Sequence, residues 1–362
     1  MNSRDNSDDG ASFAKHRQYS ERDLNELRGP VKSYVEETTH PPQPLGDDKQ
    51  TPELKMWTRT EYDVEGHAVL RGSHNPGGSE WVTRYAYDPS GKLLKEATGM
   101  EGAPAAETAY HYDDMGRLQS ITNSRKPESP ITFRYDAIGR KTKLQISLPE
   151  DYLPNVSSGG FFESADRAPN LPGGGSATTI YDAYNRPIEV QTRDAKGELL
   201  SRTVRTFDNL GNVVEEKQTM DDATKMIPAE TQTRILASSD VSLDDIRDQL
   251  TKFLGNRGEN WSVAYSYDAQ GRKARTTSRV LNHMQDTIQA TYNDRGDVAL
   301  EITQSLIDSG NGKAPETRNV EGRYAYKYDD HGNWIEKKVS YRSSPDGAFI
   351  SSAQTTRTLE YF

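Results

Sequence analysis

The sequence contains no cysteine among its 362 residues, which excludes a disulfide framework, thiolate metal sites and a cysteine nucleophile. Only 33% of the residues are hydrophobic, which is less core-forming material than a single dense globule of this length normally carries. No stretch approaches the roughly 18 consecutive apolar residues that a membrane-spanning helix needs. The sequence therefore predicts no membrane insertion, and it leaves the redox compartment open.

An excess of basic residues is also missing. The 45 Lys and Arg residues are outnumbered by 55 Asp and Glu, for a net charge of -10, and this balance argues against nucleic acid or anionic lipid as a partner. Residues 1–10 lack the apolar run of a secretory signal. We expect residues 1–20 to form a disordered tail and residues 21–362 to form a single domain.

What the sequence does contain is a repeat, in which an aromatic residue, an Asp or Asn, a short variable stretch and a Gly or Asn recur nine times. Five of the eight intervals between repeats are close to 25 residues, and the three larger intervals contain insertions. The repeats begin at Tyr62, Tyr87, Tyr112, Tyr135, Tyr181, Phe207, Tyr267, Tyr292 and Tyr328.

The residues of one repeat predict a tight β-hairpin turn. Asp88 can accept hydrogen bonds from backbone amides further along the turn, and Gly91 can adopt the left-handed conformation that ends it. Alternation places Tyr110 and Tyr112 on one face of a strand, so that one face of the sheet is a tyrosine ladder. The Lys or Arg that follows the Gly is expected to pair weakly with the turn Asp and to keep the tips hydrated.

Nine such units predict an all-β fold: a curled or spiral antiparallel sheet of about nine hairpins, with one inserted α-helix. The helix is expected over 239–255, with Ser242 as its N-cap. The segment 149–177 is expected to be a long loop. Edge strands at 24–37 and 355–362 are free to pair with each other, with a neighbour or with nothing.

The motif Tyr-x-Tyr-Asp-x-x-Gly-Arg-Leu, which spans Tyr110 to Leu118, resembles the YD repeat of the RHS-repeat proteins. Close variants lie at 133–141, 265–273 and 326–334, and the resemblance runs from about Tyr62 to Trp334. It implies a spiralling sheet of hairpins, which in large members forms a hollow shell around a toxin or at a cell surface. The chain is short for a full shell and resembles the repeats without the toxin-carrying end. The resemblance implies a secreted or cell-envelope location, with a cytoplasmic one left open.

The sequence predicts no catalytic residue, no metal site and no cofactor. The seven His residues lack zinc-site spacing, and Gly-x-Ser-x-Gly is absent. The turn aspartates are explained by the turns alone. Flat aromatic rings on an open sheet can instead bind ligands such as saccharides, although packing is the commoner role for such rings. The candidate ligand-binding residues are Trp57, Trp81, Trp261, Tyr110 and Tyr265.

These observations favour a non-enzymatic scaffold or binding module of an exported or cell-envelope bacterial protein, with a carbohydrate or another protein as its ligand. One alternative is a carbohydrate-active enzyme that uses carboxylates on the concave face of the sheet, with the 149–177 loop as a lid. Another is a toxin-associated fragment of an RHS shell. Ligand identity and oligomeric state stay open.

Overall fold

The computed structural model describes residues 20–46, 49–74, 78–146, 174–220, 259–280, 284–308 and 314–362, with positions 242, 244, 245 and 248 between them. The chain order of its elements is α1 (Glu21–Leu24), β1 (Val31–His40), β2 (Pro44–Gly46), β3 (Lys49–Gln50), β4 (Leu54–Tyr62), β5 (Ala68–His74), β6 (Trp81–Tyr87), β7 (Leu93–Met100), β8 (Ala106–Tyr112), β9 (Leu118–Asn123), β10 (Lys126–Tyr135), β11 (Lys141–Ile146), β12 (Gly175–Tyr181), β13 (Pro187–Asp194), β14 (Leu199–Phe207), β15 (Val213–Thr219), β16 (Glu259–Tyr267), β17 (Lys273–Val280), β18 (Met284–Tyr292), β19 (Val298–Ile307), β20 (Glu316–Tyr328), β21 (Trp334–Arg342) and β22 (Ile350–Tyr361).

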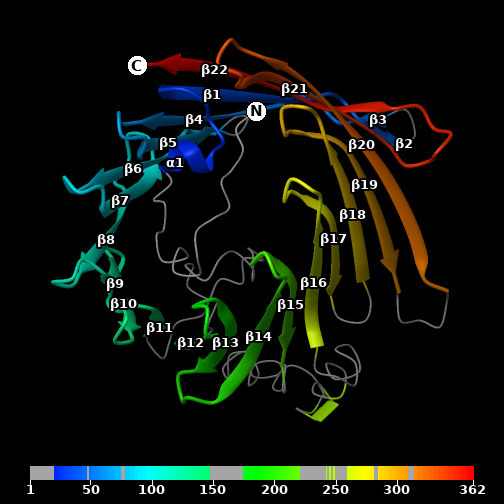
Figure 1. Cartoon of the computed structure of the whole chain (residues 1–362). Coiled ribbons are helices and arrows are strands. Elements are labelled where there is room, and N and C mark those ends of the chain that lie inside the picture. Colours follow the sequence, from blue (N-terminus) through cyan, green and yellow to red (C-terminus); the bar gives the residue numbers. More distant parts are fainter. Residues whose placement is uncertain are drawn as a thin grey trace.

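Twenty of these strands form one closed antiparallel barrel (Figure 1). From β4 to β22, each strand pairs with the next strand in the chain, and β1 pairs with both β22 and β4. The predicted fold class, a curled or spiral sheet of about nine hairpins with one inserted helix, is therefore wrong. The two expected edge strands pair with each other, so that the sheet has no free edge.

The predicted insertions are described only in part. Most of 239–255 lies outside the described residues, but at its start Asp245 donates its backbone amide to the Ser242 hydroxyl at 3.0 Å, and Ser242 donates its amide to the Asp245 carboxylate at 2.9 Å. This reciprocal pair confirms the predicted N-cap. Most of 149–177 and the tail at 1–19 also lie outside the described residues, and 175–177 begin β12.

The barrel has two different rims, because alternate connections of an antiparallel meander lie at the same end. The nine repeat turns connect β4 to β5, β6 to β7 and every second pair after them, so they share one rim, which we call the turn rim. The other connections share the opposite rim, the loop rim. The three insertions that break the repeat spacing fall between β11 and β12, β15 and β16, and β19 and β20, and all three begin and end at the loop rim.

The tight turns are confirmed. In one of them the amide of Asp113 donates to the carbonyl of Arg117 at 2.9 Å, and the amide of Gly116 donates to the carbonyl of Asp113 at 2.8 Å. The Asp113 carboxylate also accepts from the amides of Met115 and Arg117. Gly116 has a φ of 74°, and Asn185, which replaces Gly in another repeat, has a φ of 62°.

Successive hairpins are joined at the turn rim by a recurring arrangement that we call the repeat clasp. Arg117 pairs with Asp113 of its own turn at 2.8 Å, and its guanidinium lies 4.9 Å from the ring centre of Tyr135 in the next repeat. The Tyr135 hydroxyl donates to the carbonyl of Leu118 at 2.8 Å. The turn cations therefore connect repeats as well as keeping the tips hydrated.

The clasp repeats around the barrel. The cation after the turn lies over the next aromatic ring in five further repeats: Lys92 over Tyr112, Arg140 over Tyr181, Arg186 over Phe207, Arg272 over Tyr292 and Arg295, by a variant position, over Tyr328. A ring hydroxyl donates to a carbonyl of the preceding hairpin at Tyr87, Tyr112, Tyr181, Tyr267, Tyr292 and Tyr326. Each repeat is therefore fixed to the one before it.

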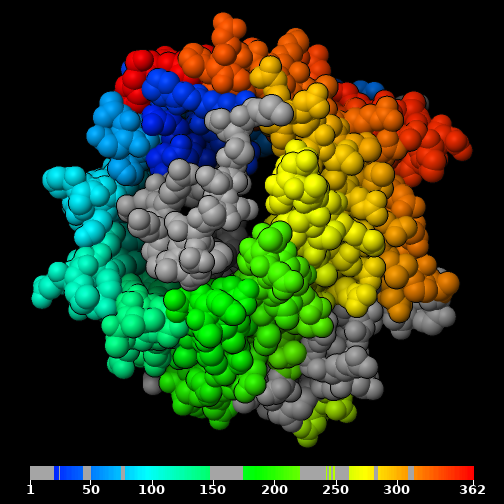
Figure 2. All heavy atoms as spheres, viewed as in Figure 1, coloured from blue at the N-terminus to red at the C-terminus, as the bar shows by residue number. Residues whose placement is uncertain are grey.

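The tyrosine ladder forms the inner face of the barrel. The short helix α1 lies inside the ring (Figure 1), and Leu27, which follows it, packs with Val31, Tyr62 and Ala68 in a buried cluster. In the space-filling view the coloured strands follow one another around a ring (Figure 2), as expected for a barrel. The opposite, outer face carries ion pairs such as Arg84 with Glu101. No helix within the described part of the chain is long and apolar enough to cross a membrane.

The left-handed turn position is tested at Gly139, where φ is 88° and an added Cβ would meet no atom within 4 Å. We expect Gly139→Ala to lower the free energy of unfolding by about 1 to 2 kcal/mol, because only backbone strain is added. Gly139→Asn should cost less, as Asn185 already occupies the equivalent position. Urea denaturation compares the two variants, and equal stabilities for Ala and Gly at this position would contradict the turn assignment.

The clasp also predicts a pH dependence. The backbone amide of Arg117, and after it the guanidinium, holds the pKa of Asp113 below its ordinary value. A lowered folded-state pKa stabilises the fold above the unfolded pKa of about 3.9, and this contribution is lost as the pH falls through the folded pKa. We expect Asp113→Asn to reduce the loss of stability below about pH 4, measured by urea unfolding at a series of pH values. The control is Asp114→Asn, in the same turn, and identical profiles for the two variants would contradict the prediction.

Candidate functional site

The segment from α1 to β1 crosses the inside of the turn rim and is tied to the first repeat turn. Ser20 and Asp23 cap α1 with reciprocal hydrogen bonds. The amide of Arg22 donates to the carbonyl of Gly66 at 3.0 Å, and the side-chain amide of Asn25 donates to the Tyr62 hydroxyl at 2.8 Å. The helix is therefore fixed to the β4–β5 hairpin.

The same segment is tied to the last repeat turn through Asn333, which is only 3% exposed. The Asn333 side chain accepts from the amide of Arg28 at 2.7 Å and donates to the carbonyl of Arg28 at 2.8 Å. It also donates to the Tyr361 hydroxyl at 2.8 Å, which in turn donates to Asp329. One buried amide thus connects the N-terminal segment, the β20–β21 turn and the last strand.

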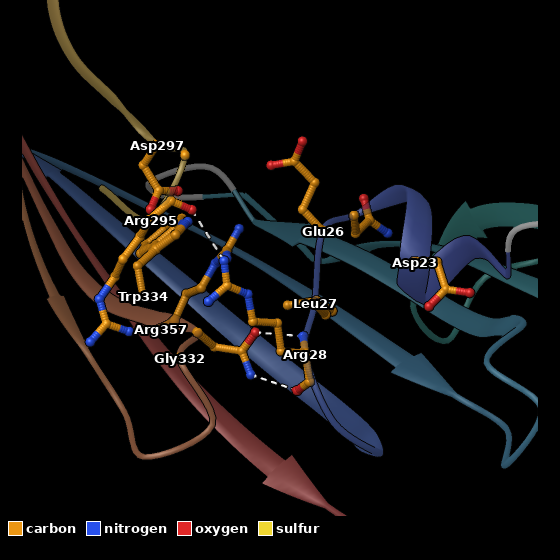
Figure 3. Close-up of a pocket in the computed structure, with 12 residues that line it drawn as sticks. Asp23, Glu26, Leu27, Arg28, Arg295, Asp297, Gly332, Trp334 and Arg357 are labelled. Atoms are coloured by element: carbon orange, nitrogen blue, oxygen red, sulfur yellow. Dashed lines mark hydrogen bonds between the residues drawn. The ribbon is translucent and has the colours of Figure 1, made fainter. Parts of the chain in front are cut away.

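A polar pocket of about 740 Å³ lies between the N-terminal segment and the β18–β19 and β20–β21 turns (Figure 3). Its charged lining residues are Asp23, Glu26, Arg28, Arg295, Asp297 and Arg357. Arg357 is held in place, since it pairs with Glu36 and lies 3.4 Å from the ring centre of Trp334. Asp297 accepts from the Tyr328 hydroxyl at 2.6 Å. The pocket therefore places guanidinium groups beside carboxylates, of which Asp297 already accepts a hydrogen bond.

Two of the sequence-predicted ligand residues lie near the loop rim on opposite faces. Trp57 is on the outer face of β4 and stacks on His74, with ring centres 5.4 Å apart. Trp81 is on the inner face of β6, where its register partner is Met100, and each of these two side chains is 46% exposed. Trp81 is thus the accessible one of the inward-facing candidates.

The other three predicted ligand residues are engaged in packing on the inner face. Trp261 is 9% exposed. Burial raises the pKa of Tyr110, and the neighbouring Glu96 raises it further. Burial likewise raises the pKa of Tyr265, and Lys273 lies 4.5 Å from its ring centre. The structure therefore does not bring the five predicted residues together: they lie on β4, β6, β8 and β16 and on both faces of the barrel.

The sequence analysis did not predict the pocket residues, although two of them depart from the repeat pattern. Asn333 occupies the position after the turn Gly where most repeats have Lys or Arg, and Arg295 stands directly before the turn Gly. Both are departures from the repeat. Arg28 and Arg357 show no such departure, because they lie outside the repeats.

The described residues hold no group of three or more His, Asp or Glu placed to bind a metal ion. The carboxylates of the turn aspartates already accept hydrogen bonds within their own turns. The side chain of Arg140 lowers the pKa of Asp136, as the hydroxyl of Ser90 lowers that of Asp88. Such carboxylates stay ionised and hydrogen-bonded, which suits a structural role.

No family model matches this chain, and no curated protein matches it. Among solved structures, a porin-like protein from Bacteroides uniformis is similar at 9% identity and a TM-score of 0.32, over 92% of this chain and 98% of that one. A porin-like protein from Bacteroides vulgatus is similar at 13% identity and a TM-score of 0.15, over 92% and 98%. A beta-barrel-like protein with a domain of unknown function from Brucella abortus is similar at 11% identity and a TM-score of 0.16, over 93% and 100%. Similarities at these scores support no conclusion about function.

Asn333 provides the test of how the N-terminal segment is held. We expect Asn333→Ala to lower the free energy of unfolding by about 2 to 4 kcal/mol, because it leaves backbone groups of Arg28 and the Tyr361 hydroxyl without their partner. The matched control is Asn212→Ala at the same turn position, where the side chain donates to Asp208 at 3.0 Å and, among the described residues, to no backbone group. Its expected cost is below about 1 kcal/mol. Equal losses in urea denaturation would contradict a special role for Asn333.

Proposed function

We propose that this chain is a YD-repeat protein of the RHS type that works as a non-enzymatic scaffold and binds a polypeptide segment on the inner face of its loop rim. The repeat resemblance is supported by the turns, since the Asp, Gly and following cation all have a structural use in the repeat clasp. A ring of hairpins fixed to one another in this way makes a stiff wall, which suits a scaffold.

The observation that supports a binding function is the exposure of apolar side chains on the inner face near the loop rim. Trp81 and Met100 are each 46% exposed, and Val280 and Met284, paired in register on another part of the barrel, are 37% and 40% exposed. Folding alone does not require these side chains to face open space. Apolar groups left accessible on a concave surface are typical of binding surfaces, and Met suits a surface that must adapt to a chain.

The alternative of a carbohydrate-active enzyme receives less support. A general acid needs a raised carboxyl pKa, whereas hydrogen bonds from its own turn, first from the backbone amide of Arg117, lower the pKa of Asp113. The most buried inner-face carboxylate that we can describe, Glu216, is paired with Arg205. Carbohydrate binding without hydrolysis remains the second candidate, because the half-exposed ring of Trp81 offers a flat face to a sugar.

A secreted or cell-envelope location forms part of the proposal and derives from the family resemblance. It is compatible with the outer face of the barrel, where charged residues such as Lys95 and Glu107 pair at 2.6 Å while half exposed.

Binding is tested with the purified chain on a peptide array and a glycan array, with glycan hydrolysis measured in parallel. We expect peptides with apolar residues to bind, and Trp81→Ser to weaken that binding at least fivefold, since the exposed ring is removed. Trp57→Ser is the matched control, because this tryptophan lies on the outer face at the same rim. Hydrolysis of a glycan would overturn the non-enzymatic function, and equal effects of the two substitutions would overturn the inner-face site.

A further inference from the structure

The turn-rim pocket contains two guanidinium groups directed at one point. Gly332 marks that point: a Cβ placed on it would lie 2.8 Å from Nη1 of Arg28 and 3.4 Å from Nη1 of Arg295. Arg28 comes from the segment before β1, and Arg295 comes from the tip of the β18–β19 turn. Residues far apart in the chain thus bring two like charges close to Gly332.

Three of the other four charged groups of the pocket already have partners. Arg357 pairs with Glu36, the Asp297 carboxylate accepts from Tyr328, and Asp23 accepts the capping hydrogen bonds of Ser20. Glu26 is exposed and points away from the two arginines in Figure 3. Among the described residues, none of these acids forms an ion pair with Arg28 or Arg295.

Arg28 and Arg295 make only neutral contacts within the part of the chain that the structure describes. Arg28 donates to the carbonyl of Arg295 at 3.2 Å, and the Arg295 guanidinium lies 4.3 Å from the ring centre of Tyr328. Two neighbouring guanidinium groups repel each other, and an anion between them removes that repulsion. The planar guanidinium fork can donate two parallel hydrogen bonds to a pair of oxygens of a phosphate, sulfate or carboxylate group.

We propose that this pocket binds an oxyanion, the phosphate, sulfate or carboxylate group of a small ligand, between Arg28 and Arg295. The bound anion links the N-terminal segment to the β18–β19 turn at the place where the barrel closes. This site lies at the turn rim, while Trp81 lies near the loop rim, so it goes beyond the proposed function and does not depend on it.

The test is calorimetric titration of the full chain with sodium phosphate, sodium sulfate and sodium glucuronate at constant low ionic strength, followed by thermal unfolding at each ligand concentration. We expect saturable binding of at least one of the three, and a melting temperature that rises with its concentration. Which of the three binds distinguishes phosphate, sulfate and sugar-acid ligands. Binding of none of them would overturn the proposal.

Two arginine substitutions, one control and one reserve variant locate the site. Arg28→Gln and Arg295→Gln should each weaken the binding at least tenfold, because one of the two guanidinium groups is lost. Lys196→Gln removes one positive charge from the same position of another turn, directly before Gly197 at the loop rim, and should leave the affinity unchanged. If Arg28→Gln does not fold, Arg295→Lys, which keeps the charge but loses the planar fork, should still weaken binding. Equal affinities for the Arg295→Gln and Lys196→Gln variants would show general charge screening and overturn the site.

Discussion

The fold depends on one repeated interaction, the packing of a turn cation onto the aromatic ring of the next repeat while it pairs with its own turn aspartate. Taken singly, an exposed ion pair or a cation over a ring contributes about 1 kcal/mol or less. In the clasp the aspartate also accepts backbone amides, and the ring hydroxyl donates to the preceding hairpin. The same residues therefore shape each turn and fix its neighbour, which explains how a chain with 33% hydrophobic residues keeps a large sheet in register.

Closure of the sheet divides the molecule into a uniform rim and a variable rim. All nine turns of the turn rim keep the same length, and the variable connections begin and end at the loop rim. The turn rim departs from uniformity at several turns, and one of these is the place where the N-terminal segment docks. There Asn333 takes the place of a cation and binds the backbone of Arg28 from both sides. The pocket lies between that segment and the turns beside it.

Local structure could be read from the sequence because its causes are local. Asp113 and Gly116 define their turn within a few residues, and Asn185 shows the same left-handed geometry. Closure of the barrel could not be predicted from the sequence, because it depends on pairing between residues such as Thr38 and Thr355, which are 317 positions apart. The five predicted ligand residues failed to converge for a related reason: periodicity assigns a residue to a face, but the position of its strand around the barrel depends on closure.

Departures from a repeat are the most informative positions in a protein of this kind. A residue that follows the repeat is explained by the clasp, so a residue that breaks it at the same place needs a different partner. Asn333 has such a partner in Arg28. Arg295 reaches the ring of Tyr328 from a different turn position than the other clasp cations. Its guanidinium has this ring on one side and a like charge nearby. A cation placed against another cation does not stabilise a fold by itself. An anion bound between the two cations would remove their repulsion and explain the position of Arg295. For this reason we infer a bound oxyanion at the pocket and not at the regular repeats.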